Sequence, residues 1–265
     1  MTAYEKSTDR SVAVSHLTSD SLRHSLTLKM LSLHPEACVS TIFENSDGWA
    51  CVTEMNTEVS RWDRSAYPRS KRIVTFDGNN DLLLRAAFDL ATKGESVFKV
   101  HDPITRPLVA HLPGYRLVQA FLSYSTSNKS WLKTPATTGI CECTELTPEA
   151  LHLLAQNGYT AEELQGYFLD GARWFGLTKG SRCVCACLVY RNYQDIWEIG
   201  AVYTVPEERG KGYAKSVVSA AAQTLLRKGC TPRYVFRSDN DTSRAVTEAI
   251  GLKHVLTIEH FASTE

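Results

Sequence analysis

The sequence lacks an apolar run long enough to cross a lipid bilayer, and its N-terminal stretch, MTAYEKSTDRSVAVSHLTSD, lacks the apolar core of a signal peptide. It also has no excess of either charge, because 29 Lys and Arg residues balance 29 Asp and Glu residues. A neutral chain has no overall field that draws it to nucleic acid or to an anionic membrane. We therefore expect a cytoplasmic protein with a small-molecule partner and neither a nucleic-acid nor a membrane partner.

CxxC pairs are also absent, although the chain contains 8 cysteines. Zinc sites commonly use such pairs, so we expect no metal. Cys183, Cys185 and Cys187 alternate in RCVCACLVY, which places them on one face of a strand. We interpret them as buried thiols that act as small apolar side chains, in preference to disulfide partners or metal ligands.

The 265 residues contain two halves in which strand and helix patterns alternate. A polar stretch from Ser125 to Gly139, STSNKSWLKTPATTG, is the candidate linker, and it predicts domains at residues 1–128 and 139–265. The second half reads as a strand, two helices, three strands, a helix, a strand, a helix and a final strand. The predicted fold class is α/β of the α+β kind, with a mixed and mostly antiparallel sheet flanked by helices.

The stretch TVPEERGKGYAKSVV, from Thr204 to Val218, leads from a predicted strand through a glycine turn into a helix. Unpaired backbone N–H groups converge at a helix N-terminus, and the helix dipole favours negative charge there. The turn is therefore predicted to bind a phosphate group. A P-loop would need glycines in place of Arg209 and Ala214, and a dinucleotide fingerprint would need a third glycine in place of Lys215.

Arg209, Gly212 and Ala214 fit a different pattern, Arg/Gln-x-x-Gly-x-Gly/Ala. This pattern resembles the pyrophosphate-binding motif of the GNAT superfamily of N-acetyltransferases. The resemblance covers about the second half of the chain, since the order of elements and the segment DNDTSRAVTEAIGLKH also fall where that family has them. It implies a GNAT-type sheet and acetyl-CoA as co-substrate, without a metal.

The resemblance also implies which residues bind the coenzyme. The strand before the turn would pair with the pantetheine arm, the turn amides would hold the pyrophosphate, and Asn240 would contact the pantetheine or cap the following helix. These residues are Val202, Tyr203, Thr204, Arg209, Gly210, Lys211, Gly212, Tyr213, Ala214, Lys215 and Asn240.

Acyl transfer to an amine requires an acceptor for the amine proton and stabilisation of an oxyanion. Glu198 lies in DIWEIGAVYT, where some GNAT enzymes have their general base, and its apolar neighbours predict a raised pKa. The alternative is a glutamate held in a salt bridge at a strand edge. For the oxyanion, the resemblance implies a backbone N–H such as that of Val202.

The resemblance fails at the group that protonates the leaving thiolate. Many family members have a tyrosine in the last helix, and that position is Thr247 here. Tyr190, Tyr193 or Tyr203 could substitute, or the thiolate could leave through water. His254 and His260 lie in the last strand, and we interpret both as structural.

The first half has no glycine turn of this kind, so we interpret it as a degenerate GNAT-like half. This tandem arrangement is similar to that of the glycine N-acyltransferase-like branch. The basic segment RWDRSAYPRSKR, from Arg61 to Arg72, could meet an anionic acceptor or the 3′-phosphate of the coenzyme, but a solvated loop is the favoured interpretation.

The predicted function is acetyl transfer from acetyl-CoA to the amine of a small molecule or amino acid, with Glu198 as general base. Acetylation of protein lysines or N-termini and a non-catalytic acyl-CoA sensor are the alternatives. The oligomeric state is open between a monomer and a homodimer, and the sequence leaves the acceptor and the acyl chain length open.

Overall fold

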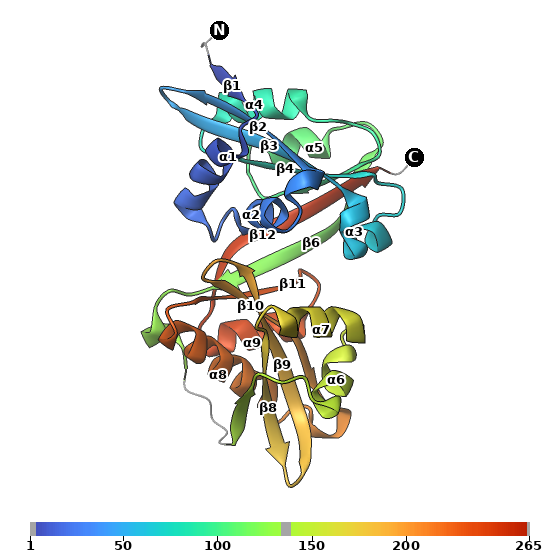
Figure 1. The fold of residues 1–265 in the computed structure, drawn as a ribbon, viewed down its shortest axis with the longest axis vertical. Helices are drawn as coiled ribbons and strands as arrows, with labels where there is room; N and C mark the ends of the chain where they lie inside the picture. Colours follow the sequence, from blue (N-terminus) through green and yellow to red (C-terminus); the bar gives the residue numbers. More distant parts are fainter. Residues whose placement is uncertain (1–3, 134–138, 264–265) are drawn as a thin grey trace. The chain divides into compact units, whose positions relative to one another are not determined.

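The protein was analysed as a computed structural model that describes residues 4–133 and 139–263 (Figure 1). The chain divides into two compact units. Unit 1 comprises Met1–Phe121 and Leu256–Glu265, and unit 2 comprises Leu122–Val255. The division predicted from sequence, at 1–128 and 139–265, assigns the last residues differently, because the end of the chain returns to unit 1. Residues 134–138 of the expected linker lie outside the described residues.

Unit 1 contains strands and helices in alternation and shares two strands with unit 2. Helix α2 is preceded by a 3-10 turn at Thr18–Asp20. The elements in chain order are β1 Glu5–Ser7, α1 Arg10–Leu17, α2 Ser25–Leu33, β2 Cys38–Asn45, β3 Gly48–Asn56, α3 Arg61–Ala66, β4 Arg72–Gly78, α4 Asp81–Leu90, β5 Ser96–Val100, α5 Thr105–Ala110, β6 Tyr115–Ser125 and, from the C-terminus, β12 Lys253–Ser263.

The sheet of unit 1 follows the order β1-β2-β3-β4-β5-β12. Neighbouring strands are antiparallel except β4 and β5, which run parallel from the pair Arg72↔Ser96 to the pair Thr75↔Lys99. The rings of Phe76 and Phe98 stack with their centroids 6.0 Å apart, within the range of about 4.5–7 Å for aromatic pairs. Helix α4 packs its apolar face on this core through Leu83 and Leu84.

The segment predicted as a solvated basic loop, Arg61 to Arg72, begins instead as helix α3, so that prediction is wrong. Ser60 caps the helix by accepting from the backbone N–H of Asp63. Asp63 is buried and lies 2.6 Å from the ammonium of Lys99 on β5, which is buried as well. Each of these two buried charges would be strongly destabilising without the other, because it would then be buried and uncompensated. Their pairing fixes the helix on the sheet.

His260 on β12 is buried in unit 1, as the structural interpretation of this residue requires. Its Nδ1 lies 2.6 Å from the hydroxyl of Tyr67. Burial, with a smaller effect of the Lys99 charge, lowers the pKa of His260 to about 2. The native protein therefore holds a neutral imidazole here, whereas an unfolded histidine titrates at about pH 6.5.

We expect the stability of the chain to fall as the pH is lowered below about 6.5, since only the unfolded state then binds a proton at His260. The depressed native pKa makes this loss about 1.4 kcal/mol for each pH unit, and it continues towards the native pKa of about 2. Urea unfolding at pH 6.5 and pH 4.5 should give a smaller loss in His260→Asn than in the wild type, by about 2.3 kcal/mol. Equal losses in the two proteins would contradict this assignment.

Unit 2 has the order of elements predicted for the second half. Helices α6 and α7 lie together on one side of strands β8 and β9, and α8 lies on the other side (Figure 1). The elements are β7 Ile140–Cys143, α6 Pro148–Ala155, α7 Ala161–Leu169, β8 Arg173–Lys179, β9 Arg182–Tyr193, β10 Ile196–Thr204, α8 Tyr213–Arg227, β11 Thr231–Arg237 and α9 Asp241–Ile250, with the ends of β6 and β12.

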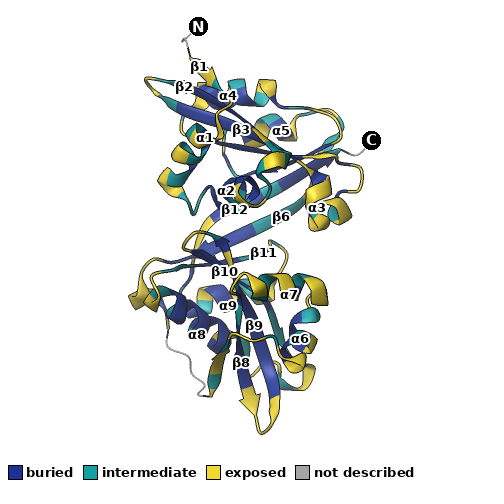
Figure 2. Ribbon diagram, viewed as in Figure 1, coloured by how far each residue is buried: buried dark blue, intermediate teal, exposed yellow. Residues whose placement is uncertain are grey.

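The sheet of unit 2 contains the order β11-β10-β9-β8-β7, in which β10 and β11 are parallel and the other pairs are antiparallel. Its middle strands are buried along most of their length, while the outer faces of the helices are exposed (Figure 2). The predicted fold class, a mixed and mostly antiparallel sheet flanked by helices with a second α/β half, is confirmed.

The three alternating cysteines of β9 are buried, and all 8 cysteines of the chain are free. Burial raises the pKa of Cys183 and of Cys185 to about 11. These thiols stay protonated at neutral pH, which agrees with their interpretation as small core side chains. Among the described residues, no helix combines the length and the hydropathy that crossing a bilayer requires.

Candidate functional site

A cavity of about 1150 Å³ lies within unit 2, at the end of the β10 and β11 pair. These strands are parallel only from Ile196↔Thr231 to Glu198↔Arg233, and beyond that pairing both strands line the cavity. This volume is somewhat larger than the range of about 300–1,000 Å³ for small-molecule sites, which suits a ligand larger than an amino acid. Of the residues predicted to bind the coenzyme, those on its wall are Val202, Tyr203, Thr204, Arg209, Gly210, Gly212, Tyr213, Ala214, Lys215 and Asn240.

Strand β10 carries a bulge where it enters the cavity. Gly200 pairs with Leu188 of β9, but the next register pair is Tyr203 with Ala186, so Ala201 and Val202 face a single residue. Ala201 adopts a φ of 48°, a left-handed conformation that side chains other than glycine seldom take. A bulge leaves a residue out of the ladder and redirects the backbone, so polar backbone groups here can face a ligand.

The glycine turn leaves the N-terminus of α8 open. Gly210 and Gly212 have φ values of 78° and 81°, and the N-cap residue Gly212 has no side chain to accept from the first amides of the helix. A Cβ built on either glycine would meet nothing within 4 Å. Amides without a side-chain cap at the start of a 15-residue helix, beside open space, are an arrangement that favours an anion.

Unit 1 has the corresponding strand and helix, β4 and α4, without this opening. The N-cap of α4 is Asn80, and its side-chain oxygen accepts from the amides of Leu82 and Leu83, each at 3.1 Å. The amides that are open in unit 2 are therefore satisfied by a side chain in unit 1. This difference supports the interpretation that only the second half has a coenzyme turn.

Charged side chains on the turn are held by one another. Glu208 accepts from Lys211 at 2.8 Å and from Lys179 at 3.0 Å, and these bonds lower the pKa of its carboxyl. Lys211, which was predicted to bind the coenzyme, is thus directed to Glu208 and does not line the cavity. Arg209 donates to the backbone carbonyl of Thr204 at 3.1 Å, which closes the turn onto the end of β10.

Asn240 caps helix α9, since its side-chain oxygen accepts from the amide of Ser243 at 2.9 Å, and it also lines the cavity. The N-cap role that the sequence left open is therefore present. Thr247 on the same helix is fully buried, and its hydroxyl donates to the carbonyls of Ser243 and Arg244. A hydroxyl bonded within its own helix cannot replace the tyrosine found at this position in many family members.

Glu198 is buried on β10 and does not line the cavity. Its Oε1 accepts from Arg233 at 2.7 Å and from Asn192 at 2.9 Å, and Arg233 also donates to Ser123 at 3.1 Å. Its surroundings are therefore more polar than the apolar neighbours in the sequence indicate. Within the described chain, both of these hydrogen bonds are accepted by Oε1 of Glu198.

The cavity is also lined by residues that the sequence did not single out. Gln156, Asn157 and Tyr159 come from the connection between α6 and α7, and Tyr234 comes from β11. The hydroxyl of Tyr159 lies 3.7 Å from the Cβ position of Gly200, beside the bulge. Burial raises the pKa of Tyr159, and it raises that of Tyr234 to about 12, so both are neutral donors at physiological pH. The only feature of the sequence that could have indicated these residues is their position, in a connection between two helices or at the end of a strand.

Comparison with known proteins agrees with this geometry. Residues 176–260, which run from β8 into β12, match the family described as FR47-like protein. The chain is similar in structure to a GCN5-related N-acetyltransferase from Sphaerobacter thermophilus, with 13% identity over 98% of this chain and 95% of that one and a TM-score of 0.61. A GCN5-related N-acetyltransferase from Kribbella flavida gives 12% identity over 93% and 96% of the two chains and a TM-score of 0.59.

A third similar structure is a tandem GNAT protein from the clavulanic acid biosynthesis pathway, with 12% identity over 99% of both chains and a TM-score of 0.56. No curated protein sequence matches the chain. The chain has the fold of the GNAT acetyltransferases in its tandem form. Its C-terminal half has the GNAT type of fold, and residues 176–260 of that half match the FR47-like family.

Proposed function

We propose that unit 2 transfers the acetyl group of acetyl-CoA to the primary amine of a small molecule or an amino acid. The observation that carries this proposal is the open N-terminus of α8 next to the bulged end of β10, within one cavity. The amides of Gly210 to Lys215 bind the pyrophosphate, and the exposed edge of Val202, Tyr203 and Thr204 binds the pantetheine arm. The thioester then lies beside Gly200 and the Val202 amide, which stabilises the oxyanion.

In this proposal the amine attacks the thioester carbonyl, the C–N bond forms, and the C–S bond of the tetrahedral intermediate breaks to release the thiolate of coenzyme A. Glu198 accepts the amine proton through a water molecule, because its carboxylate lies outside the cavity wall. The hydroxyl of Tyr159 is the neutral donor beside the bulge that returns a proton to the thiolate. Tyr190, Tyr193 and Thr247, whose hydroxyls were also considered for the proton donor, do not line the cavity.

A second candidate function is a sensor that binds acyl-CoA without turning it over. The helix-bonded hydroxyl of Thr247 and the ion pair of Glu198 favour it, because each removes a group that family members use in the chemistry. Acetylation of protein lysines or N-termini is a variant of the enzymatic proposal. It requires the cavity to accept a peptide alongside the coenzyme.

A thiol-release assay with acetyl-CoA separates these proposals. The purified chain is incubated with amino acids, polyamines, aminoglycosides and short peptides, and free thiol is followed by absorbance with a disulfide reagent. We expect multiple turnovers with a free amine of one small-molecule class and little with peptides. Release on peptides alone would favour the protein acetyltransferase. If acetyl-CoA raises the melting temperature but no acceptor gives turnover, the sensor replaces the enzyme.

A further inference from the structure

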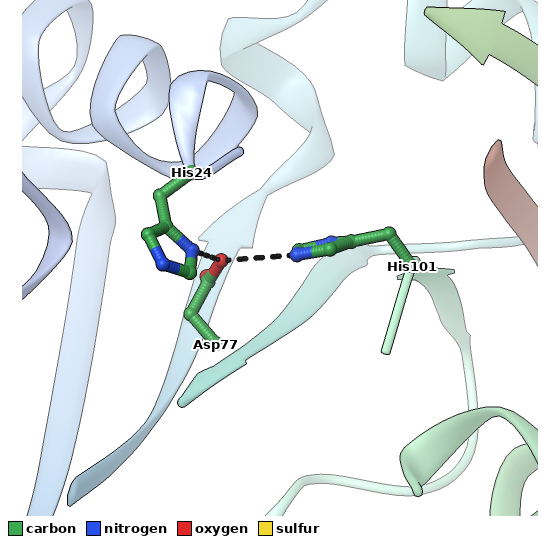
Figure 3. Close-up of side chains that lie close together, drawn as sticks. All are labelled: His24, Asp77 and His101. Atoms are coloured by element: carbon green, nitrogen blue, oxygen red, sulfur yellow. Dashed lines mark hydrogen bonds and ion pairs between the residues drawn. The ribbon is translucent and has the colours of Figure 1, made fainter. Parts of the chain in front are cut away.

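Unit 1 brings three side chains of metal-ligating type together in its interior (Figure 3). His24 precedes α2, Asp77 lies near the end of β4, and His101 follows β5. The side chains are 4%, 1% and 4% exposed, respectively. Oδ1 of Asp77 lies 2.6 Å from Nδ1 of His24 and 3.6 Å from Nε2 of His101, and the three donor atoms lie within 4.8 Å of one another.

The hydrogen bonds within this cluster do not include Nε2 of His101. Its Nε2 is buried and has no hydrogen-bond partner among the described residues, since 3.6 Å to Asp77 is too long for such a bond. A buried polar atom without a partner costs about 1–3 kcal/mol, and native proteins contain few of them. Figure 3 shows the rings of His24 and His101 approaching the same carboxylate from two directions. Nε2 of His101 and Nδ1 of His24 thus both face Oδ1 of Asp77, which is the arrangement of donor atoms around a shared ligand position.

The opposite side of the Asp77 carboxylate is already fixed. Its Oδ2 accepts from the hydroxyl of Thr27 at 2.6 Å, and the hydroxyl of Thr27 also lies 3.0 Å from that of Thr75. Carboxylates that bind metals are commonly oriented in this way by hydrogen bonds to their other oxygen. Thr27 therefore holds Asp77 so that Oδ1 alone faces the two imidazoles.

The cluster occupies the part of unit 1 that corresponds to the cavity of unit 2. The parallel pairs of β4 and β5 end at Thr75↔Lys99, and Asp77 and His101 are each two residues beyond that pair. In unit 2 the last parallel pair of β10 and β11 is Glu198↔Arg233, and the positions two residues beyond it are Gly200 and Val235, which line the cavity. Small or apolar residues are thus replaced in unit 1 by two potential ligands, and His24 adds a third from the segment before α2.

We propose that His24, Asp77 and His101 bind one divalent first-row transition-metal ion, with Zn²⁺ as the best match. Two imidazoles and a carboxylate are ligands that Zn²⁺ takes readily, whereas Mg²⁺ and Ca²⁺ prefer sites made of oxygen atoms. The three side chains leave the remaining coordination position to water. The ion joins the start of α2 to β4 and to the segment after β5, so its role is to hold unit 1 together.

The test uses the full chain, purified without a metal-affinity resin, stripped with a chelator and then dialysed. Zn²⁺ is added, free ion is removed, and bound zinc is measured by plasma mass spectrometry and by competition with a chromophoric chelator. We expect the wild type to retain about one Zn²⁺ per chain and to melt at a higher temperature with Zn²⁺ than without it. Thr27→Val should retain the ion with an affinity roughly 10–100-fold lower.

His101→Gln should lose both the bound zinc and the zinc-dependent rise in melting temperature. Two matched variants control for ion bound elsewhere: His111→Gln removes an exposed histidine of the same unit, and Cys141→Ser removes an exposed thiol. Both should behave as the wild type does. If His101→Gln does not fold, the wild type still decides the question, because added Co²⁺ must give the visible absorption of a low-coordinate site. A wild type that keeps no zinc, or that loses its zinc in Cys141→Ser, overturns the proposal.

Discussion

Replacing Glu198 with Gln should lower the turnover of acetyl transfer by about 10²–10⁴-fold, which is the usual contribution of a general base. Glutamine preserves the size of the side chain and can still accept from Arg233 and Asn192, the two groups that bind Oε1. It cannot accept the amine proton from a water molecule at neutral pH. The affinity for acetyl-CoA should stay unchanged, because Glu198 does not line the cavity.

The measurement combines steady-state thiol release with the shift in melting temperature that acetyl-CoA causes. Glu142→Gln is the matched control, since Glu142 also lies on a strand of unit 2 and pairs with Arg173 at 2.6 Å. This variant should retain turnover. If Glu198→Gln loses stability but keeps the turnover of the folded protein, the carboxylate serves only to neutralise Arg233. Losing one partner of a buried ion pair costs about 3–5 kcal/mol in either case, so the turnover of the folded protein distinguishes the two outcomes.

The sequence predicted the second half well because its signals are local. Thr147 and the pair Thr160 and Glu163 cap helices α6 and α7 as their positions indicate. Gly212 ends the strand-to-helix turn with a positive φ, and spacing alone placed that turn. The part of the cavity wall that the turn and the adjacent strand form could be predicted as well, since these two segments are contiguous in the chain. The family comparison and the fold agree with the prediction from the motif.

The first half was harder to predict because its pattern depends on distant contacts. Helix α1 and strand β2, Cys38–Asn45, were not recognised in the sequence. Asp63 looked like part of a solvated charged loop until Lys99 was placed beside it. Pairings across dozens of residues have no periodicity that a single sequence reveals.

The same limit applies to single side chains at the candidate sites. Glu198 has apolar neighbours in the chain, but Arg233 faces it from β11, which no local pattern indicates. Tyr159 reaches the bulge from the connection of two helices. His24, Asp77 and His101 have no spacing in common with a known metal motif, and only the packing of three elements brings them together. Sequence motifs thus located the glycine turn, while the positions of the groups around it required the fold.

Gly212→Asp should raise the dissociation constant of acetyl-CoA by about 100-fold, equivalent to about 2.7 kcal/mol. Gly212 has a φ of 81°, a conformation that Asp and Asn accept more readily than other residues do. The new carboxylate would accept from the first amides of α8, as Asn80 does on α4, and would repel the pyrophosphate. The new cap contributes about 1 kcal/mol, and the strain of a side chain at this φ costs a similar amount, so the stability of the free protein should change much less than the affinity.

Two further variants isolate the cause of the lost affinity. Gly212→Asn fills the same space and caps the same amides without the charge, so it should weaken binding less than Gly212→Asp does, and the difference should shrink as salt is added. Gly229→Asp places the same side chain just beyond the other end of α8, at a glycine with a similar φ of 73° and open surroundings. That variant should bind acetyl-CoA as the wild type does, in isothermal titration of each protein. If Gly212→Asp and Gly229→Asp bind acetyl-CoA with equal affinity, the pyrophosphate is not bound at the start of α8. A carboxylate at that position would repel a pyrophosphate bound there and lower the affinity.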